Sequence, residues 1–446
     1  MMSHAVKIMK AVCTALALLI VVPDTMAFPD PAAVAAQASR KKKSRKKRAS
    51  ASKKKRKSKR RSGRRRRRRG TRRPPVIQTL WMSPDSASWI RKGRRGIIVY
   101  RDTTGCVRAM QPCSLSPGAG YAYASAINEY ARTLAKDGVK VYMLMAPSQG
   151  EYYMPEGYGV PGAEQRCILA TASALDTMVT PVFVNDTLRN HIDEEIYNRT
   201  DHHWAPLGAY YAGSAFAEAA GVGYRPLKEY TPQVVRGYVG TMHKFSGDPE
   251  VKKAPEDFIY FMPPTGYKAE FVNYSLSGGR TVGETPLHEE IFFKHYPDGS
   301  GAAYLTFMGG DTRTVKVSQT GGTPGRRLLI VKDSFGNAMA SNLFGSFEEV
   351  HVVDFRYFPH NLADYARRHG ITDMVFVNCV ALAVNPKTAA RLRTMLLQGL
   401  EDDSVSGPMG DDDFEPVDNA GDESDADSEV DDDNDNEEET IDGDEE

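Results

Sequence analysis

Some residue types are scarce in this chain of 446 residues, and their scarcity limits what the protein can be. Cysteine occurs 5 times, at spacings that fit no standard zinc pattern, which argues against a zinc-binding module. Four of the five lie beyond the N-terminal region: Cys106, Cys113, Cys167 and Cys379. Two readings of these four stay open, either disulfides joining 106 to 113 and 167 to 379 in an oxidising compartment, or four free thiols.

Charge of one sign is missing from two long segments. Residues 40–73 contain 24 Lys or Arg and no acid, and residues 401–446 contain 24 Asp or Glu and no base, so the formal net charge of +1 hides two opposite tails. Such blocks cannot bury enough apolar surface to offset the entropy of ordering the chain. We therefore predict a disordered polybasic segment over 28–73, a folded domain over 74–400 and a disordered acidic tail over 401–446.

The first 27 residues have the pattern of an export signal. Lys7 and Lys10 precede an uncharged stretch over 11–22, and Thr25-Met26-Ala27 offers a small-residue cleavage site. The stretch is shorter than the roughly 20 residues that span a bilayer as a helix, which favours cleavage over anchoring. The basic block follows closely and opposes translocation. We predict a signal peptide over 1–27 and a periplasmic or cell-envelope location, with an uncleaved anchor or cytoplasmic retention as the alternatives.

Between the charged segments, apolar runs of strand length alternate with helical patterns. Strands are predicted over 97–100, 139–145, 181–184, 328–331, 350–355 and 374–377, and helices over 123–134, 166–178, 337–344, 361–369 and 386–398. This alternation is typical of a parallel sheet with helices on both faces. Residues 224–325 carry short aromatic and β-branched runs instead, which indicate a β-rich insertion. The predicted fold class is α/β, a three-layer α/β/α domain with this insertion.

Two short motifs carry candidate chemistry: Thr200-Asp201-His202-His203-Trp204 and Lys332-Asp333-Ser334-Phe335. A serine hydroxyl becomes nucleophilic when an imidazole removes its proton. Ser334 follows a buried strand and precedes a helix, so it is expected at the carboxyl end of the sheet, where open α/β sheets bind ligands. His203 is the predicted base and Asp201 its orienting carboxylate, because residues two apart face the same side of an extended segment. His202, expected to face away, is the alternative base.

No metal and no other cofactor is predicted at these motifs. Asp201, His202 and His203 carry suitable ligand atoms, but adjacent histidines are expected to point apart and no further ligand stands at a standard spacing. The predicted chemistry therefore depends on side chains alone.

Further polar groups are expected at the same edge of the sheet. The backbone N–H groups of Ser334 and the residues after it are candidate oxyanion donors, and the side chain of Asn337 is another candidate or a local cap. Arg356 and Tyr357 follow the strand over 350–355. Arg356 is a candidate for holding an anionic sugar or the developing negative charge, with a structural ion pair as the alternative.

The two motifs and their surroundings resemble the DHHW family, a branch of the SGNH-hydrolase-like group that includes the alginate and peptidoglycan O-acetylation proteins. The resemblance runs in collinear order over about 96–377, through segments 145–155, 197–211, 240–248, 309–311, 331–337 and 354–357. It implies an SGNH-like sheet with Asp201 and His203 acting on Ser334. Lys332-Asp333-Ser334 departs from the Gly-Asp-Ser of ordinary esterases, which leaves the second oxyanion donor unassigned.

The resemblance and the motifs together predict an exported, serine-dependent acyl transferase or esterase, with acetyl as the expected group and hydroxyls of cell-envelope polysaccharide as the substrate. The resemblance also implies a membrane O-acyltransferase partner as the acyl donor of a transferase. Two alternatives remain. One is a catalytically inactive SGNH-like scaffold or glycan-binding protein, and the other is a polyanion-binding protein that acts through its charged tails.

The polybasic segment predicts a separate kind of partner. Clustered Lys and Arg attract any polyanion, and the attraction weakens as salt rises. The segment has no interleaved aromatic residues on which bases would stack. In an exported protein this composition favours anionic glycan or lipid headgroups over nucleic acid.

Overall fold

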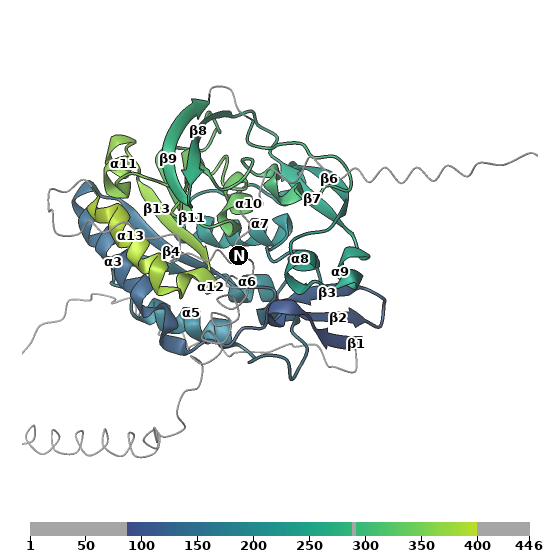
Figure 1. Ribbon diagram of the computed structural model, residues 1–446. Helices are drawn as coiled ribbons and strands as arrows, with labels where there is room; N and C mark the ends of the chain where they lie inside the picture. The colour runs from purple at the N-terminus through teal and green to yellow at the C-terminus, as the bar shows by residue number, and fades with distance from the viewer. Residues whose placement is uncertain (1–86, 288–290, 399–446) are drawn as a thin grey trace, which may run out of the picture. The chain divides into compact units, whose positions relative to one another are not determined.

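The computed structural model of the protein describes residues 87–287 and 291–398, which belong to one structural unit (Figure 1). The signal peptide predicted over 1–27, the polybasic segment over 28–73 and the acidic tail over 401–446 lie outside the described residues. Among the helices within the described ranges, none combines the length and apolar composition needed to cross a membrane.

An eight-stranded sheet occupies the middle of this unit, in the strand order β5-β4-β13-β11-β12-β10-β8-β9. Its first five strands run parallel to one another and its last three are added antiparallel. The strands are β4 (Lys140–Ala146), β5 (Val179–Val182), β8 (Lys268–Ser277), β9 (Arg280–Leu287), β10 (Arg313–Ser318), β11 (Thr323–Lys332), β12 (Phe347–Asp354) and β13 (Asp373–Cys379). The predicted α/β fold is confirmed, although the sheet is mixed and not wholly parallel.

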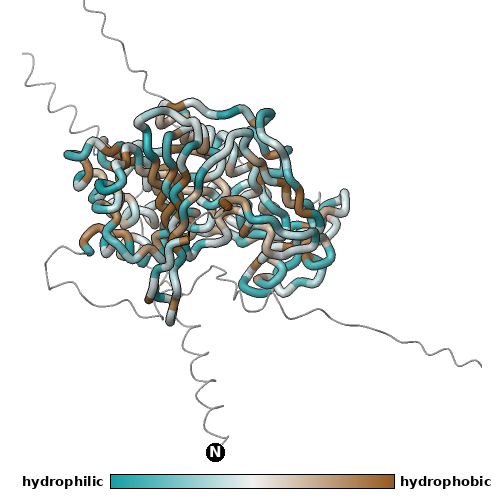
Figure 2. The backbone as a smooth tube through the Cα atoms, turned by 90° about the horizontal axis from the view of Figure 1, so that it is seen from above, coloured by the Kyte–Doolittle hydropathy of each residue, from teal (hydrophilic) through white to brown (hydrophobic). Residues whose placement is uncertain are grey.

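Helices cover both faces of the sheet, because its central strands bury side chains on both sides. In β11, Leu328 and Ile330 enter one core while Leu329 and Val331 enter the other. The first core includes side chains of α6 (Asn185–Arg189), α7 (Pro206–Ala220) and α10 (Phe335–Ser341), and the second those of α3 (Tyr121–Leu134), α11 (Leu362–Arg368), α12 (Val380–Ala383) and α13 (Pro386–Leu397). Figure 1 shows the helices on the two sides, and Figure 2 shows apolar segments gathered between them.

The antiparallel strands come from the segment 224–325, in which the sequence predicts a β-rich insertion. Strands β8, β9 and β10 extend the central sheet, because β10 pairs with β12 and β8 pairs with β10. The glycine pair Gly278-Gly279, with positive φ at both positions, turns the chain so that β9 folds back onto β8 as a tight hairpin. The two remaining strands of the segment, β6 (Thr231–Tyr238) and β7 (Glu256–Met262), form a small sheet of their own.

A third sheet lies at the N-terminal end of the described chain. It consists of β1 (Ala87–Lys92), β2 (Ile98–Asp102) and β3 (Val107–Met110), so the strand predicted over 97–100 exists but does not join the central sheet. The remaining short helices are α4 (Gly150–Tyr153), α5 (Ala163–Ser173), α8 (Met242–Ser246) and α9 (Pro249–Lys252), with 3-10 turns η2 (Arg94–Gly96), η3 (Pro117–Gly120), η4 (Ala135–Asp137), η5 (Leu227–Glu229) and η6 (Ala303–Thr306). The four cysteines in the described ranges are free thiols.

Candidate active site

Ser334 stands between the end of β11 and the start of α10, at the carboxyl edge of the parallel strands. Asp333 fixes this turn from both sides. Its carboxylate accepts from the N–H of Phe335 at 3.0 Å and from the N–H of Cys379, at the end of the neighbouring β13, at 2.7 Å. The serine is thus held by the sheet itself, with 6% of its surface exposed.

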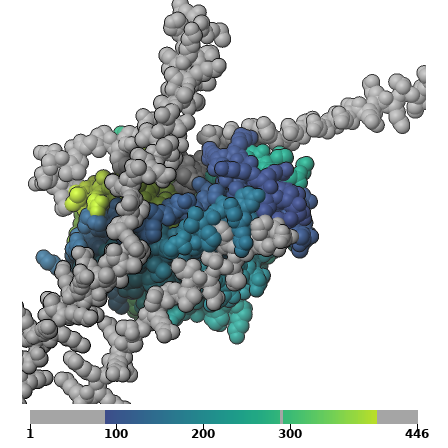
Figure 3. Space-filling model, turned by 90° about the horizontal axis from the view of Figure 1, so that it is seen from below, coloured from purple at the N-terminus to yellow at the C-terminus, as the bar shows by residue number. Residues whose placement is uncertain are grey.

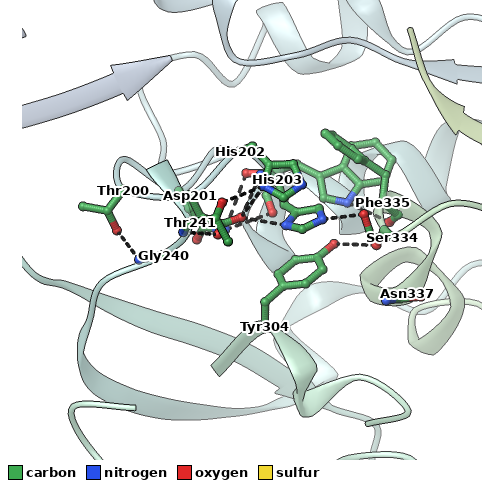
Figure 4. A network of polar contacts seen from close by, with 12 residues as sticks. Thr200, Asp201, His202, His203, Gly240, Thr241, Tyr304, Ser334, Phe335 and Asn337 are labelled. Carbon is green, nitrogen blue, oxygen red and sulfur yellow. Dashed lines mark hydrogen bonds and ion pairs between the residues drawn. The ribbon is translucent and has the colours of Figure 1, made fainter. Parts of the chain in front are cut away.

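The structure brings the two motifs together at this turn (Figure 4). His203 Nε2 lies 2.6 Å from Ser334 Oγ, and His203 Nδ1 lies 2.6 Å from Asp201 Oδ1. Trp204, a fully buried ring, adds a second link, because its indole N–H donates to the backbone oxygen of Phe335 at 3.0 Å. The three predicted residues Asp201, His203 and Ser334 therefore form a continuous chain of hydrogen bonds, although His203 and Ser334 are 131 positions apart in the sequence.

Asp201 is fully buried, and its carboxylate is held by further donors. The N–H of Thr241 donates to Oδ2 at 2.9 Å, and Gln149 donates to the backbone oxygen of Asp201 at 2.8 Å. A side chain at Gly240 would meet Asp201 at 2.4 Å, so this close approach requires glycine. Burial opposes ionisation, but the charges of His203 and His202 and the hydrogen bond from His203 outweigh it, holding the pKa of Asp201 well below its usual range.

His203 is clamped between two rings. The ring of Tyr304 stacks on it with centroids 3.9 Å apart and an interplanar angle of 6°, and the ring of His202 lies 3.7 Å away on a tilt. The hydroxyl of Tyr304 also donates to the backbone oxygen of Ser334 at 3.1 Å. Tyr304 therefore contacts both the imidazole and the serine turn. Sequence reasoning missed it, because it comes from a 3-10 turn inside the β-rich segment and no motif marks it.

The expectation that His202 faces away from the site is wrong. The chain bends through residues 199–203 and is not an extended strand, so alternation of side chains does not apply. His202 Nδ1 lies 2.7 Å from Thr241 Oγ1, beside the Asp201–His203 pair. The imidazoles do not point apart, and Asp201, His202 and His203 offer ligand atoms within 4.8 Å of one another. Both Nδ1 atoms are engaged in these hydrogen bonds, so we propose no metal at this cluster.

The side-chain amide of Asn337 donates to Asp311 Oδ1 at 2.7 Å, which engages one of its two N–H groups. Its role as an oxyanion donor stays a prediction. The predicted backbone donors are also largely engaged, since the N–H groups of Phe335 and Gly336 donate to Asp333 and that of Asn337 donates to Ser334. Within the described ranges, the N–H of Ser334 alone is left without an acceptor in this turn.

Arg356 takes part in a buried ion network, the alternative that the sequence left open. Its guanidinium contacts Asp354 at 2.7 Å and Asp311 at 2.8 Å. Lys332, which lies beside Asp354 in the parallel register of β11 and β12, contacts the same two carboxylates at 2.7 Å each. The cations outweigh the effect of burial and hold the pKa of Asp311 well below its usual range. The guanidinium of Arg356 also lies 5.2 Å from the ring centroid of Tyr357.

Glu256 is a second residue that sequence reasoning missed, and it supports the loop that carries the two histidines. Glu256, in β7, accepts from the N–H of Arg199 at 2.8 Å and from both the N–H and the hydroxyl of Thr200 at 2.7 and 2.6 Å. The hydroxyl of Thr200 in turn accepts from the N–H of Gly240 at 3.0 Å. The β6–β7 sheet thus positions the loop that carries Asp201. No sequence motif near Glu256 predicts this contact.

The central sheet and the serine turn define an α/β protein with a serine, histidine and aspartate at the carboxyl edge of its parallel strands. A family model described as DHHW protein matches residues 107–353. A crystal structure of a DHHW family protein from Eubacterium siraeum is 34% identical, with a TM-score of 0.60 and a match that covers 68% of this chain and 98% of that one. The chain belongs to the DHHW family, as the resemblance predicts.

Two other solved structures match at lower identity. Bacillus cereus PatB1, solved with a sulfonyl adduct, is 18% identical over 64% of this chain and 96% of its own, with a TM-score of 0.51, and shares the fold. The O-acetyltransferase domain of Pseudomonas putida AlgJ is 13% identical over 68% of this chain and 98% of its own, with a TM-score of 0.38. A search of curated proteins finds no significant match.

Proposed function

We propose that this protein is an exported, serine-dependent acyl transferase or esterase, with acetyl as the group and cell-envelope polysaccharide as the substrate. The proposal depends on the position of the His203 imidazole, which lies 2.6 Å from the hydroxyl of Ser334 and 2.6 Å from the carboxylate of Asp201. A base within hydrogen-bond reach of a hydroxyl, and itself oriented by a carboxylate, is the arrangement that activates a serine.

The reaction begins when His203 Nε2 takes the proton of Ser334 while Oγ attacks the acyl carbonyl. The imidazolium that forms is stabilised by Asp201, whose depressed pKa keeps it ionised. His203 then gives its proton to the leaving group and an acyl-Ser334 ester remains. In the second half, His203 removes the proton of a sugar hydroxyl or of water, which attacks the ester and releases Ser334. The N–H of Ser334 is the donor that remains for the oxyanion.

The acceptor decides between transferase and esterase, because a sugar hydroxyl and water enter the same second step. The family resemblance supports acetyl as the transferred group and a membrane O-acyltransferase partner as the donor. The predicted signal peptide supports an envelope location. The polybasic segment would then meet anionic glycan or lipid headgroups there.

The proposal is tested by turnover of an activated acetyl ester by the full-length protein. Ser334→Ala and His203→Ala are expected to remove turnover, and an aryl sulfonyl fluoride is expected to add one sulfonyl group at Ser334, measured by mass spectrometry. Ser341→Ala is the matched control, because this buried serine of α10 bonds only to a backbone oxygen of its own helix. Equal turnover by wild type and both site variants would overturn the proposal.

Asp201→Asn provides a finer test of the same geometry. The amide keeps the size of the carboxylate but does not stabilise the imidazolium, so ester turnover is expected to fall by about 10³–10⁴-fold. The protein should remain folded, which circular dichroism checks. A loss below about tenfold would mean that the carboxylate does not orient His203.

A further inference from the structure

A cavity of about 430 Å³ is lined by none of the triad residues, and the acyl-transfer proposal does not use it. Three parts of the chain line it: the β2–β3 hairpin, helix α4 and the turn after α6. Its volume is within the range of about 300–1,000 Å³ that is usual for small-ligand sites. Figure 3 shows the surface of the N-terminal sheet next to that of the segments that follow it in the chain.

One face of the β2–β3 hairpin supplies the polar wall of this cavity. Tyr100 pairs with Arg108 across the hairpin, and Asp102 and Cys106 follow two positions further on, so all four side chains project from the same face. The opposite face is apolar where it packs, with Val99 among the residues that enter a core beside α8 and α9. The face that lines the cavity is itself partly packed, because Tyr100 joins Ile98, Met110 and Met154 in a small core. Its polar groups are the guanidinium of Arg108 and the carboxylate of Asp102.

Arg108 is the central group of the wall. Its guanidinium lies 4.1 Å from the ring centroid of Tyr153, and it donates to Gln149 Oε1 at 3.2 Å and to the backbone oxygen of Tyr197 at 3.4 Å. These acceptors are uncharged, so the contacts do not neutralise the cation. An arginine held over an aromatic ring, with neutral acceptors for some of its five N–H groups, can donate the others to oxygen atoms of a ligand.

The composition of the lining favours a sugar. Arg108 donates hydrogen bonds, Asp193 accepts them, and the rings of Tyr100 and Tyr153 supply apolar surface. Asp102 offers its second carboxylate oxygen, because Oδ1 already accepts from Thr104 and Cys106 in the turn. Neighbouring hydroxyls of a sugar ring both donate and accept, and the faces of the ring are apolar. Two carboxylates against one guanidinium leave the wall net negative, which disfavours uronates and phosphates. The cavity is therefore matched to an uncharged sugar.

The cavity is connected to the candidate active site through a single buried side chain. Gln149 accepts from Arg108, and its amide nitrogen donates to the backbone oxygens of Ala109 at 2.9 Å and Asp201 at 2.8 Å. Only 1% of Gln149 is exposed, so this bridge is fixed. A ligand that contacts Arg108 is thus linked through Gln149 to the backbone oxygen of Asp201.

We infer that this cavity is a binding subsite for an uncharged sugar unit of the polysaccharide. The inference rests on the proposed function for the identity of the polymer, but sugar binding itself requires no catalysis. It is measured by calorimetry on full-length Ser334→Ala with three probes: an N-acetylglucosamine tetramer, cellotetraose and, as the anionic comparison, a guluronate tetramer. At least one uncharged tetramer is expected to bind, and the guluronate tetramer is expected to bind more weakly.

Two substitutions test the location. Arg108→Gln removes the donor, and Cys106→Tyr fills the cavity, and each is expected to weaken binding by about tenfold or more. Arg101→Gln is the matched control, because Arg101 projects from the other face of β2 and pairs with Glu250 at 2.7 Å. It is expected to change binding by less than twofold. Equal binding by all three variants would overturn the assignment.

A measurement on the wild-type protein avoids any risk of misfolding. The bound tetramer is expected to slow alkylation of Cys106 by a maleimide and to leave alkylation of Cys113, which does not line the cavity, unchanged. No binding of either uncharged tetramer at millimolar concentration, or equal protection of both thiols, would overturn the inference. Loss of sugar binding with ester turnover intact would overturn the subsite alone, whereas sugar binding without Ser334-dependent turnover would overturn the enzymatic proposal.

Discussion

Two groups of buried carboxylates near the candidate site behave in opposite ways. Asp201 and Asp311 are held ionised, with pKa values well below the usual range. Glu151 and Glu164, close behind Gln149, resist ionisation, because burial and the mutual repulsion of the two acids raise the pKa of Glu151 to about 7 and burial raises that of Glu164. All four are largely removed from water, so burial alone does not explain the difference.

The neighbours of each acid decide its charge. Asp311 contacts the cations of Lys332 and Arg356, and these contacts outweigh the cost of burial. Glu151 lies 3.8 Å from Arg189 and accepts from the backbone N–H of Glu164 at 3.2 Å, and the attraction of Arg189 does not outweigh burial and the repulsion from Glu164. The cations beside the serine turn therefore keep Asp311 ionised, whereas Glu151, beside the histidine loop, has a pKa of about 7.

The largest effect that would test this comparison is expected from Lys332→Met. The substitution leaves Asp311 and Asp354 buried with one cation between them, and loss of one partner of such a network costs about 3–5 kcal/mol of unfolding free energy. Urea denaturation measures the change. The control is Lys316→Met, at a partly exposed lysine 3.5 Å from Glu349, which is expected to cost about 1 kcal/mol or less. If both variants lose similar amounts of unfolding free energy, the charge of Lys332 does not stabilise the buried carboxylates.

Glu151→Gln tests the other member of the comparison through pH. Because the folded-state pKa of Glu151 is raised to about 7, the folded protein holds a proton that the unfolded chain releases near 4.5, and wild-type stability falls as pH rises between these values. The amide cannot lose a proton, so the variant should lack this fall, which amounts to about 3 kcal/mol.

Urea unfolding from pH 5 to pH 8 measures the difference. Glu348→Gln is the control, since this acid lies at the protein surface and bonds a backbone N–H at an exposed position. Parallel stability curves for wild type and Glu151→Gln would show that Glu151 is ionised throughout and would remove the contrast with Asp311.

The smallest effect is expected from Tyr304→Phe. The ring stays against His203, while the hydrogen bond from the hydroxyl to the backbone oxygen of Ser334 is lost, at a cost of about 1 kcal/mol. Ester turnover should fall by about fivefold if this cost appears in the transition state. Tyr260→Phe, in the same aromatic cluster beside Phe307, is the control. If Tyr304→Phe leaves ester turnover unchanged, the hydroxyl of Tyr304 contributes to the stability of the protein only.

Local pattern was enough to predict most of the central elements. The strand over 328–331 and the helix over 386–398 appear as β11 and α13, because a continuous apolar run and a capped amphipathic pattern are properties of neighbouring residues. The sequence pattern did not predict helix α7. Eight of its residues are Ala or Gly, and it is apolar around most of its surface, so it shows little of the periodicity that marks a surface helix.

The residue types at the site were also visible in the sequence, but their orientations were not. Asp201, His203 and Ser334 stood out as an acid, a base and a hydroxyl at strand and loop ends. The expected orientation of His202 was wrong because the loop bends and brings its ring to Thr241, and the sequence did not predict that the amide of Asn337 would donate to Asp311. Both contacts join segments that are distant in sequence.

The sequence by itself determined the α/β alternation, the charged composition of the two ends and the set of side chains able to activate a serine, because each depends on residues close together along the chain. Tertiary structure alone decided that β8, β9 and β10 would extend the sheet and that Tyr304 would stack on the imidazole. It also decided that lysine and arginine would form ion pairs with aspartate near the turn that carries Ser334. Those outcomes depend on which surfaces meet when separate segments pack, and packing selects partners by shape and charge across hundreds of positions.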